Sequence, residues 1–257
     1  MQKPATVFLM YHELGLGQRD LSQSEPRYPR YVIPVAEFEA QMASLKASGL
    51  RGVTVTEALQ FASPAVAITF DDGCETDLVA AAPVLQKFGL GATFFVIPGF
   101  LGNRSYMSRE QMRELSDAGF EIGCHSMTHP CLTDLDDAGL QREIHDAKIT
   151  LEQITGKAVE HFSCPGGDYD ARIIQVAKAS GYRSMATSGP RANSHSSDPF
   201  TLGRVPIKRG LKPASFQKLC RGRTLWKLNL QVGVQAGARS LLGDGRYYRL
   251  RAAILKK

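Results

Sequence analysis

Two adjacent carboxylates, Asp71 and Asp72, end an apolar run of the sequence and are followed by Gly73. Neighbouring carboxylates repel each other and are costly to remove from water together, so a closed site keeps both only with a compensating cation. A divalent metal would let one carboxylate act as a ligand while the other stays free to accept a proton. The alternative is an ordinary Asp-Gly turn that caps the helix that follows.

A second candidate group is the histidine pair His125 and His129, four residues apart. Neutral imidazole and carboxylate groups are good ligands of zinc and similar metals. Two histidines and one aspartate leave coordination positions open for water and substrate, as a catalytic metal site requires. Such a pair taken alone is more often ordinary surface or core chemistry, but this pair follows an apolar segment, as the aspartate pair does.

The elements that would position these residues alternate between strand and helix. Apolar segments predict strands at 7–12, 53–55, 65–70, 92–97, 120–124, 161–164, 183–187 and 200–207. Helical spacing and end signals predict helices over 35–48, 76–88, 108–118, 136–154 and 171–180. This alternation predicts an α/β protein with parallel strands and outer helices. In such barrels the chemistry lies at the C-terminal ends of the strands. The candidates at such ends are His12, Asp71, Asp72, His125 and the turn at Pro165.

The segment Thr69-Phe70-Asp71-Asp72-Gly73, followed by His125-Ser126-Met127-Thr128-His129, resembles two motifs of the polysaccharide deacetylase family. This family is also called the NodB-homology or carbohydrate esterase 4 family, and the resemblance covers roughly residues 5 to 210. It implies a distorted (β/α)7-type barrel and a metal-dependent hydrolase of N-acetyl groups on amino sugars. It also implies that Asp71 is the catalytic base and that Asp72, His125 and His129 bind the metal.

The turn Cys164-Pro165-Gly166-Gly167 resembles the family's third motif, which is usually Arg-x-Pro-x-Gly. We expect Pro165 and Gly166 to contact substrate, with the Gly166 N–H stabilising an oxyanion; the alternative is a plain Pro-Gly turn. Ser163 stands where the motif usually has the arginine that pairs with the catalytic aspartate. Arg204 could replace this arginine from the last strand, and we group it with the substrate-binding residues.

Two further features of the family are missing. The sequence has neither the late Leu-x-His that carries the proton donor nor the Asp-Trp motif of the acetyl pocket, and its single tryptophan, Trp226, lies near the end of the chain. Met10-Tyr11-His12 resembles the start of the poly-N-acetylglucosamine deacetylases, a subset in which an early histidine replaces the late one. Barrel closure would bring the first and last strands together, so we expect His12 to be the proton donor. The alternative is a histidine satisfied by hydrogen bonds at the strand end.

The net charge of +6 is distributed unevenly along the 257 residues. Residues 221–257 contain nine Lys or Arg and one acid, hence +8, which leaves −2 for residues 1–220. We expect residues 1–210 to form the deacetylase barrel and 211–257 a basic extension packed on it. The aromatic and basic residues at 221–257 suit an anionic membrane interface, and a solvated basic surface is the alternative. Nucleic-acid binding is not expected, because the barrel lacks a basic groove pattern or recognition motif.

The remaining expectations concern location and substrate. Residues 1–10 lack the apolar core and cleavage site of a signal peptide, so we expect a cytoplasmic protein, peripheral on the inner membrane face. The five cysteines are then reduced thiols. We expect a metal-dependent de-N-acetylase of an N-acetylated glycan or lipid-linked precursor, with Zn²⁺, or Co²⁺, Ni²⁺ or Fe²⁺, as cofactor. The alternatives are a deformylase or O-deacetylase on the same scaffold, and a barrel that binds glycan without turnover.

Overall fold

The computed structural model describes residues 5–17, 20–26, 28–60, 65–226 and 228–229. Its strands are β1 (Val7–Tyr11), β2 (Leu14–Gly15), β3 (Ile33–Pro34), β4 (Arg51–Val53), β5 (Ala65–Asp72), β6 (Thr93–Val96), β7 (Glu121–Cys124), β8 (His161–Ser163), β9 (Ser184–Ala186) and β10 (Val205–Pro206). Its α-helices are α1 (Val35–Ala47), α2 (Val55–Gln60), α3 (Ala82–Phe88), α4 (Arg109–Asp117), α5 (Asp137–Leu140), α6 (Ala147–Thr155), α7 (Ala171–Ala179) and α8 (Pro213–Cys220).

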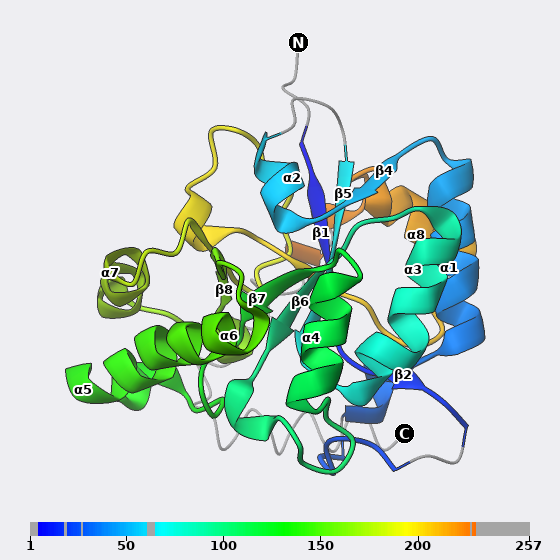
Figure 1. Cartoon of the computed structure of the whole chain (residues 1–257). Helices are drawn as coiled ribbons and strands as arrows, with labels where there is room; N and C mark the ends of the chain where they lie inside the picture. The colour runs from blue at the N-terminus through cyan, green and yellow to red at the C-terminus, as the bar shows by residue number, and fades with distance from the viewer. Residues whose placement is uncertain (1–4, 18–19, 27, 61–64, 227, 230–257) are drawn as a thin grey trace.

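Eight of the described strands form a parallel sheet, in the order β10-β1-β5-β6-β7-β8-β9 with β4 beside β5, and helices surround it (Figure 1). The short strands β2 and β3 pair with each other in a separate two-stranded sheet. The eighth strand, β4, pairs with the start of β5 at residues 65–67, whereas β6 pairs with its end at residues 69–72. The two edges of the sheet approach each other because the chain before β10 bonds to β9: Leu202 N–H donates to the Met185 carbonyl at 3.0 Å. The predicted parallel barrel with outer helices is therefore confirmed.

The core lies on both faces of this curled sheet, as strand alternation requires. On β5, Val66, Ile68 and Phe70 join the large cluster between the sheet and the helices, whereas Ala65 and Ala67 belong to a smaller cluster on the opposite face. That smaller cluster also contains Phe8, Val53, Phe95 and Ala186, from four different strands, and Leu202, which precedes β10. Thr69 and Asp71 continue the series of Ala65 and Ala67, so strand geometry turns Asp71 toward the inside of the barrel.

Local signals explain where most helices begin and end. Ser108 and Gln111 form the predicted capping box at the start of α4, each side chain bonding the other residue's backbone N–H. Gly89 and Gly156 adopt left-handed conformations directly after α3 and α6 and thereby end them. The predicted helices over 76–88 and 136–154 each contain a π-helical segment, η2 (Asp77–Ala81) and η5 (Gln141–Asp146). Hydrophobic spacing does not distinguish such segments from α-helix.

The last predicted strand, over 200–207, is shorter than expected. Pro199–Thr201 form a 3-10 turn, η7, and only Val205 and Pro206 pair with β1. Gly203 lies between these two segments, where a Cβ atom would meet the Gly189 carbonyl oxygen at 2.5 Å. The backbone at Gly203 is thus closely packed, and pairing with β1 begins only at Val205.

The predicted extension over 211–257 is described only as far as residue 229. Its helix α8 packs on α1, where Gln217 bonds Ser44 at 3.0 Å and Arg221 bonds the Ser48 carbonyl at 3.1 Å. The apolar and aromatic residues expected to meet a membrane beyond this point lie outside the described residues. No helix within the described ranges is both long and apolar enough to cross a membrane. All five cysteines are free thiols.

Candidate active site

A cavity of about 180 Å³ opens at the C-terminal ends of the strands. Its lining includes His12, Asp71, Asp72, His125, His129 and Gly166. These residues come from β5 and from the segments that follow β1, β7 and β8, as the parallel topology predicts. The structure therefore brings together all but two of the candidate site residues at one pocket, and Pro165 and Arg204 lie directly behind it.

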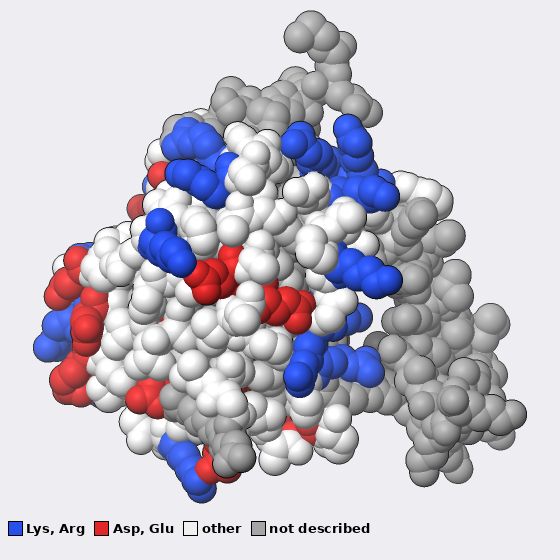
Figure 2. All heavy atoms as spheres, turned by 90° about the vertical axis from the view of Figure 1, so that its right-hand side faces the viewer, with Lys and Arg blue, Asp and Glu red and all other residues white. Residues whose placement is uncertain are grey.

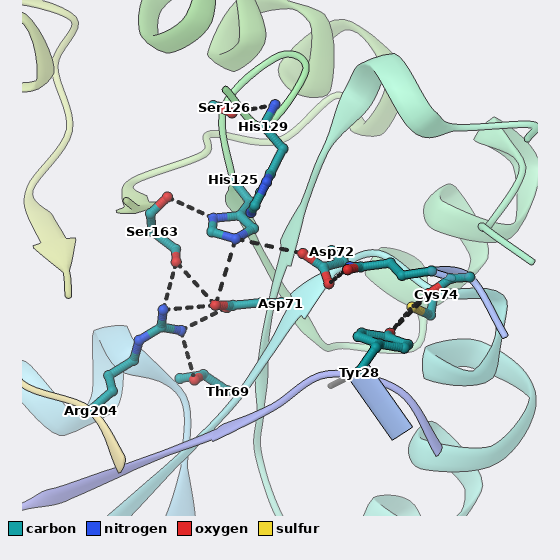
Figure 3. Close-up of polar contacts among 12 residues, drawn as sticks. Tyr28, Thr69, Asp71, Asp72, Cys74, His125, Ser126, His129, Ser163 and Arg204 are labelled. Carbon is teal, nitrogen blue, oxygen red and sulfur yellow. Dashed lines mark hydrogen bonds and ion pairs between the residues drawn. The ribbon is translucent and has the colours of Figure 1, made fainter. Parts of the chain in front are cut away.

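Arg204 lies against Asp71 inside the barrel (Figure 3). Its Nη1 donates to Asp71 Oδ1 at 2.6 Å and its Nη2 donates to Oδ2 at 2.8 Å. The guanidinium also donates to the hydroxyls of Thr69 and Ser163 and to the Thr187 carbonyl. Arg204 is 0% exposed, so it reaches Asp71 and not the cavity. This position is the one expected of the arginine that replaces the missing motif arginine, and its burial favours a role in holding Asp71.

This arginine determines the charge of Asp71. Burial by itself raises the pKa of a carboxyl group, but the Arg204 guanidinium and then His125 more than offset burial, so the pKa of Asp71 lies well below its usual range. A bidentate arginine is well suited to this task because its planar fork matches a carboxylate. Asp71 is therefore a buried, ionised carboxylate beside the pocket.

The side chain of Asp72 reaches the same pocket because its backbone adopts an unusual conformation. Side chains alternate along a strand, so regular geometry would turn Asp72 away from the face that Asp71 occupies. Its φ of +84° ends the alternation, and such a conformation is strained for a residue other than glycine. Burial, together with the negative charge of Asp71, raises the pKa of Asp72 to about 6, although His12 and Arg204 act to lower it. The positive charges of the protein therefore do not fully offset the burial of this carboxyl group.

His125 is held in one tautomer. Its Nδ1 lies 2.7 Å from the Ser163 carbonyl oxygen, which can only accept, so Nδ1 carries the proton. The opposite nitrogen, Nε2, has its lone pair free and lies 3.7 Å from Asp71 Oδ2 and 3.6 Å from Asp72 Oδ1. Burial lowers the pKa of His125 to about 4, so the ring is neutral near pH 7. A neutral histidine whose second nitrogen bonds a carbonyl is the usual arrangement of a metal ligand.

A tight loop between β7 and η4 orients His129. Ser126 and His129 both have positive φ, +62° and +61°, and the Ser126 hydroxyl accepts a hydrogen bond from the His129 N–H at 2.9 Å. Glu143 fixes the loop from η5 by accepting from Thr128 N–H at 2.8 Å and from the Thr128 hydroxyl at 2.7 Å. These contacts place the His129 ring 4.9 Å from the His125 ring.

The three predicted metal ligands meet at one point. One potential ligand atom from each of Asp72, His125 and His129 lies within 4.8 Å of the others. Two neutral imidazoles and one buried carboxylate fit a divalent cation by charge and by ligand type. Three of the four described non-glycine residues with positive φ are Asp72, Ser126 and His129, so backbone strain is concentrated at this group.

The other predicted residues lie around this centre. His12 is half-buried at the end of β1, its ring 5.2 Å from that of Tyr31, and its Nδ1 has no hydrogen-bond partner among the described residues. Gly166 lies in the pocket wall with φ +67°, and Pro165 is buried beneath it. The alternative role for His12 is a side chain satisfied by hydrogen bonds within the protein. The unpartnered Nδ1 does not support this alternative.

Sequence reasoning missed two residues that support the site. Gln23 donates from its Nε2 to Asp72 Oδ2 at 2.7 Å, and Glu143 holds the histidine loop. Neither belongs to a motif, and both act across long sequence separations. The only available signal was the length of the polar segment 13–34, since long loops after barrel strands often shape binding sites.

Comparison with known proteins agrees with this geometry. The family model for polysaccharide deacetylase matches residues 59–185. A Bacillus subtilis protein, YxkH, named as a polysaccharide deacetylase, is 31% identical over 223 residues, which are 84% of this chain and 76% of that protein. The poly-β-1,6-N-acetyl-D-glucosamine N-deacetylase of Staphylococcus aureus is 24% identical over 72% of this chain and 70% of that protein.

Solved structures show the same fold. The Streptococcus pyogenes deacetylase PplD, in complex with acetate, superposes with a TM-score of 0.75 at 21% identity, over 85% of this chain and 99% of that one. Fold and family together define an enzyme of the carbohydrate de-N-acetylase class. The chain belongs to the polysaccharide deacetylase family.

Proposed function

We propose that this protein is a metal-dependent hydrolase that removes N-acetyl groups from a glycan, or glycan precursor, that contains amino sugars. The observation that carries the proposal is the pairing of an ionised, arginine-held Asp71 with the neighbouring group Asp72, His125 and His129. The names of two relatives support the substrate class, since one acts on poly-N-acetylglucosamine and another is a chitooligosaccharide deacetylase.

In this proposal Asp72, His125 and His129 hold the metal. Bound there, a divalent cation supplies a Lewis acid that acidifies a water and polarises a carbonyl. Zn²⁺ is the default from the ligand types, and Co²⁺, Ni²⁺ or Fe²⁺ suits the same set. The residues themselves fit: the Nδ1 proton of His125 is committed to Ser163, and nearby positive charges do not fully offset the burial of the Asp72 carboxyl group.

The protein's own groups then divide the proton transfers. Asp71 accepts the proton of the attacking water, because Arg204 keeps it ionised despite burial. His12, which also lines the pocket, donates a proton to the leaving amine. The turn at Pro165 and Gly166 forms the wall where the acyl oxygen would receive a backbone hydrogen bond.

The experiment is acetate release by the purified, metal-loaded protein. The substrates offered are nucleotide-linked N-acetyl sugars, lipid-linked N-acetyl sugars and N-acetylated oligomers, with Asp71→Asn as the inactive control. We expect release by the wild type only. Formate release from N-formyl sugars, or acetate release from O-acetyl sugars alone, would favour the alternative hydrolases on this scaffold. Glycan binding without any release would make the protein a binding barrel.

We also propose that residues 221–257 contact an anionic membrane, which would place the enzyme on the inner membrane face beside a lipid-linked substrate. The support is compositional and local. Exposed basic side chains lie on α8 and just after it at Lys218, Arg221 and Arg223, and the Trp226 side chain is 63% exposed. Lys and Arg gather along this side of the molecule (Figure 2). Exposed tryptophan among basic residues suits a lipid headgroup layer.

Vesicle flotation tests the membrane proposal. The full chain should float with vesicles that contain anionic lipid and remain behind with neutral vesicles. Replacing Trp226 with Ala, together with Arg221 and Arg223 with Ser, should reduce the floated fraction. Deletion of residues 221–257 without any effect on flotation would overturn the proposal.

A further inference from the structure

The long loop over residues 13–34 contacts a proposed metal ligand directly. Nε2 of Gln23 donates a hydrogen bond to Oδ2 of Asp72 at 2.7 Å. The other oxygen of the same carboxylate, Oδ1, lies 3.6 Å from Nε2 of His125. The two oxygens of Asp72 therefore face different partners: one faces the loop and the other faces the histidine.

Asp72 has few other constraints on its orientation. Its backbone is in the strained left-handed region at φ +84°, at the last position of β5, so strand geometry does not fix the direction of its side chain. A monodentate carboxylate ligand can rotate about its terminal bond and present either oxygen, or both, to a metal. A donor on Oδ2 removes that freedom.

Hydrogen bonds hold the residue next to Gln23 in place. The neighbouring Ser22 donates from both its N–H and its hydroxyl to Glu13 Oε2, at 3.0 and 2.8 Å. At the neck of the loop, Leu14 pairs with Ile33, and the Leu14 N–H donates to the Thr76 hydroxyl at 3.2 Å. Gln23 thus extends from a fixed backbone and can set the position of Asp72.

The same loop builds one wall of the pocket. Tyr28 and Tyr31 line the cavity, the Tyr28 hydroxyl lies 2.9 Å from the Ser22 hydroxyl, and the Tyr31 ring lies against His12. Figure 3 shows Tyr28 beside Asp72 and Cys74. A displacement of Asp72 would therefore also shift the loop residues that line the pocket.

We propose that Gln23 is a positioning residue that orients Asp72 for the metal. This inference rests on the metal site of the proposed function. Hydrogen-bond partners of metal ligands typically change metal affinity by about 10- to 100-fold when they are removed. Because coupling is reciprocal, bound metal also holds the loop in place.

The test compares the full-length wild type with Gln23→Met, which has a similar length but no donor. The matched control is Gln86→Met on the exposed side of α3. The dissociation constant for Zn²⁺ is measured by competition with a chromophoric chelator, and the unfolding midpoint of each metal-free variant is measured in parallel. We expect Gln23→Met to weaken Zn²⁺ binding about tenfold or more, with the metal-free midpoint close to that of the wild type and Gln86→Met unchanged.

Amide hydrogen exchange supplies a readout that a merely structural role would not change. Addition of Zn²⁺ should slow exchange at residues 20–26 in the wild type and in Gln86→Met, and should leave it unchanged in Gln23→Met. If the wild type and Gln23→Met bind Zn²⁺ with equal affinity, the role of Gln23 is overturned, but the proposed metal site is not. A wild type that binds no Zn²⁺, Co²⁺, Ni²⁺ or Fe²⁺ overturns the proposed metal site, and this inference with it.

Discussion

Arg204 donates two parallel hydrogen bonds to Asp71, a residue 133 positions earlier in the chain, at 2.6 and 2.8 Å. The two residues meet because β10 pairs with β1 and β1 pairs with β5, which brings the last strand of the sheet close to β5. Ser163, at the position of the usual motif arginine, bonds Arg204 at 2.7 Å and leaves room for it. The family motif places this arginine at the position of Ser163, whereas here Arg204, just before β10, pairs with the same carboxylate.

Replacing Arg204 with Met should change the pH dependence of activity. In the wild type the folded pKa of Asp71 is depressed, so its ionised form contributes stability above the unfolded value of about 3.9, and this contribution is lost as the pH falls. Without the guanidinium, burial raises the pKa instead. We expect the acidic limb of kcat/KM to move to higher pH and the free energy of unfolding to fall by about 3 kcal/mol.

The measurements are a pH–rate profile and a denaturant titration at pH 7. Arg183→Met, which breaks an exposed pair with Glu160, is the control and should leave the acidic limb in place. An acidic limb that stays where it is in Arg204→Met would show that Arg204 does not set the ionisation of Asp71.

His12→Gln should separate proton donation from metal binding. If His12 protonates the leaving amine, its loss should lower kcat by about 10²- to 10⁴-fold, whereas Zn²⁺ affinity should stay near the wild-type value because the three proposed ligands are intact. Steady-state kinetics and chelator competition measure the two effects. His195→Gln, at an exposed position, is the matched control. If His12→Gln kept the wild-type kcat, the proton donor would have to be another residue.

Glu143→Ala should loosen the loop that presents His129. The Thr128 N–H and hydroxyl would lose their acceptor, which should cost about 1–3 kcal/mol of unfolding free energy and weaken metal binding. Thermal unfolding and Zn²⁺ titration check both effects. Glu114→Ala, on the exposed face of α4, should change neither quantity. If Glu143→Ala bound Zn²⁺ as tightly as the wild type, the loop would owe its geometry to Ser126 and the backbone alone.

His161 should make the protein less stable in mild acid. It is 1% exposed, and its two ring nitrogens each lie 2.8 Å from a hydroxyl, those of Ser184 and Thr56. Burial lowers its pKa even though Glu121 raises it. The unfolded chain therefore takes up a proton more readily than the folded chain, so this histidine's contribution to stability is lost as the pH falls below about 6.5.

The comparison is between the wild type and His161→Gln, in chelator, from pH 7.5 to 5. The variant should be less stable by about 1–2 kcal/mol at pH 7.5, because it makes poorer hydrogen bonds. The difference in unfolding free energy between the two proteins should become smaller toward pH 5, because only the wild type has a buried histidine whose protonation destabilises the fold. Parallel stability curves would show that His161 does not titrate in this range.

The sequence predicted the strands and helices that carry strong hydrophobic spacing and end signals, such as α1, α4 and β5. The strand-end argument placed His12, Asp71, Asp72 and His125 at one edge, because parallel strands have their C-terminal ends together. The set Asp72, His125 and His129 was implied by the resemblance to the family. The π-helical segments and the late start of β10 could not be predicted, since both depend on tertiary packing and not on local propensity.

The supporting residues of the site were harder to predict than its ligands. Gln23 and Glu143 contact the site through loop and helix positions that have no periodicity and no motif. Arg204 was predicted to replace the missing motif arginine, yet its complete burial could not be predicted from a strand pattern alone. Side-chain direction at Asp72 was also inaccessible, because it depends on a backbone conformation that the residue type disfavours.

The left-handed conformations of Asp72, Ser126 and His129 have a consequence for engineering. Glycine or asparagine would adopt each of these conformations more easily, so replacing any of the three would relieve strain. Directed evolution of the metal-free protein for heat resistance alone would thus favour substitutions at the positions that the proposed chemistry needs. A thermostable variant that remains useful has to be selected with metal present and turnover as the criterion.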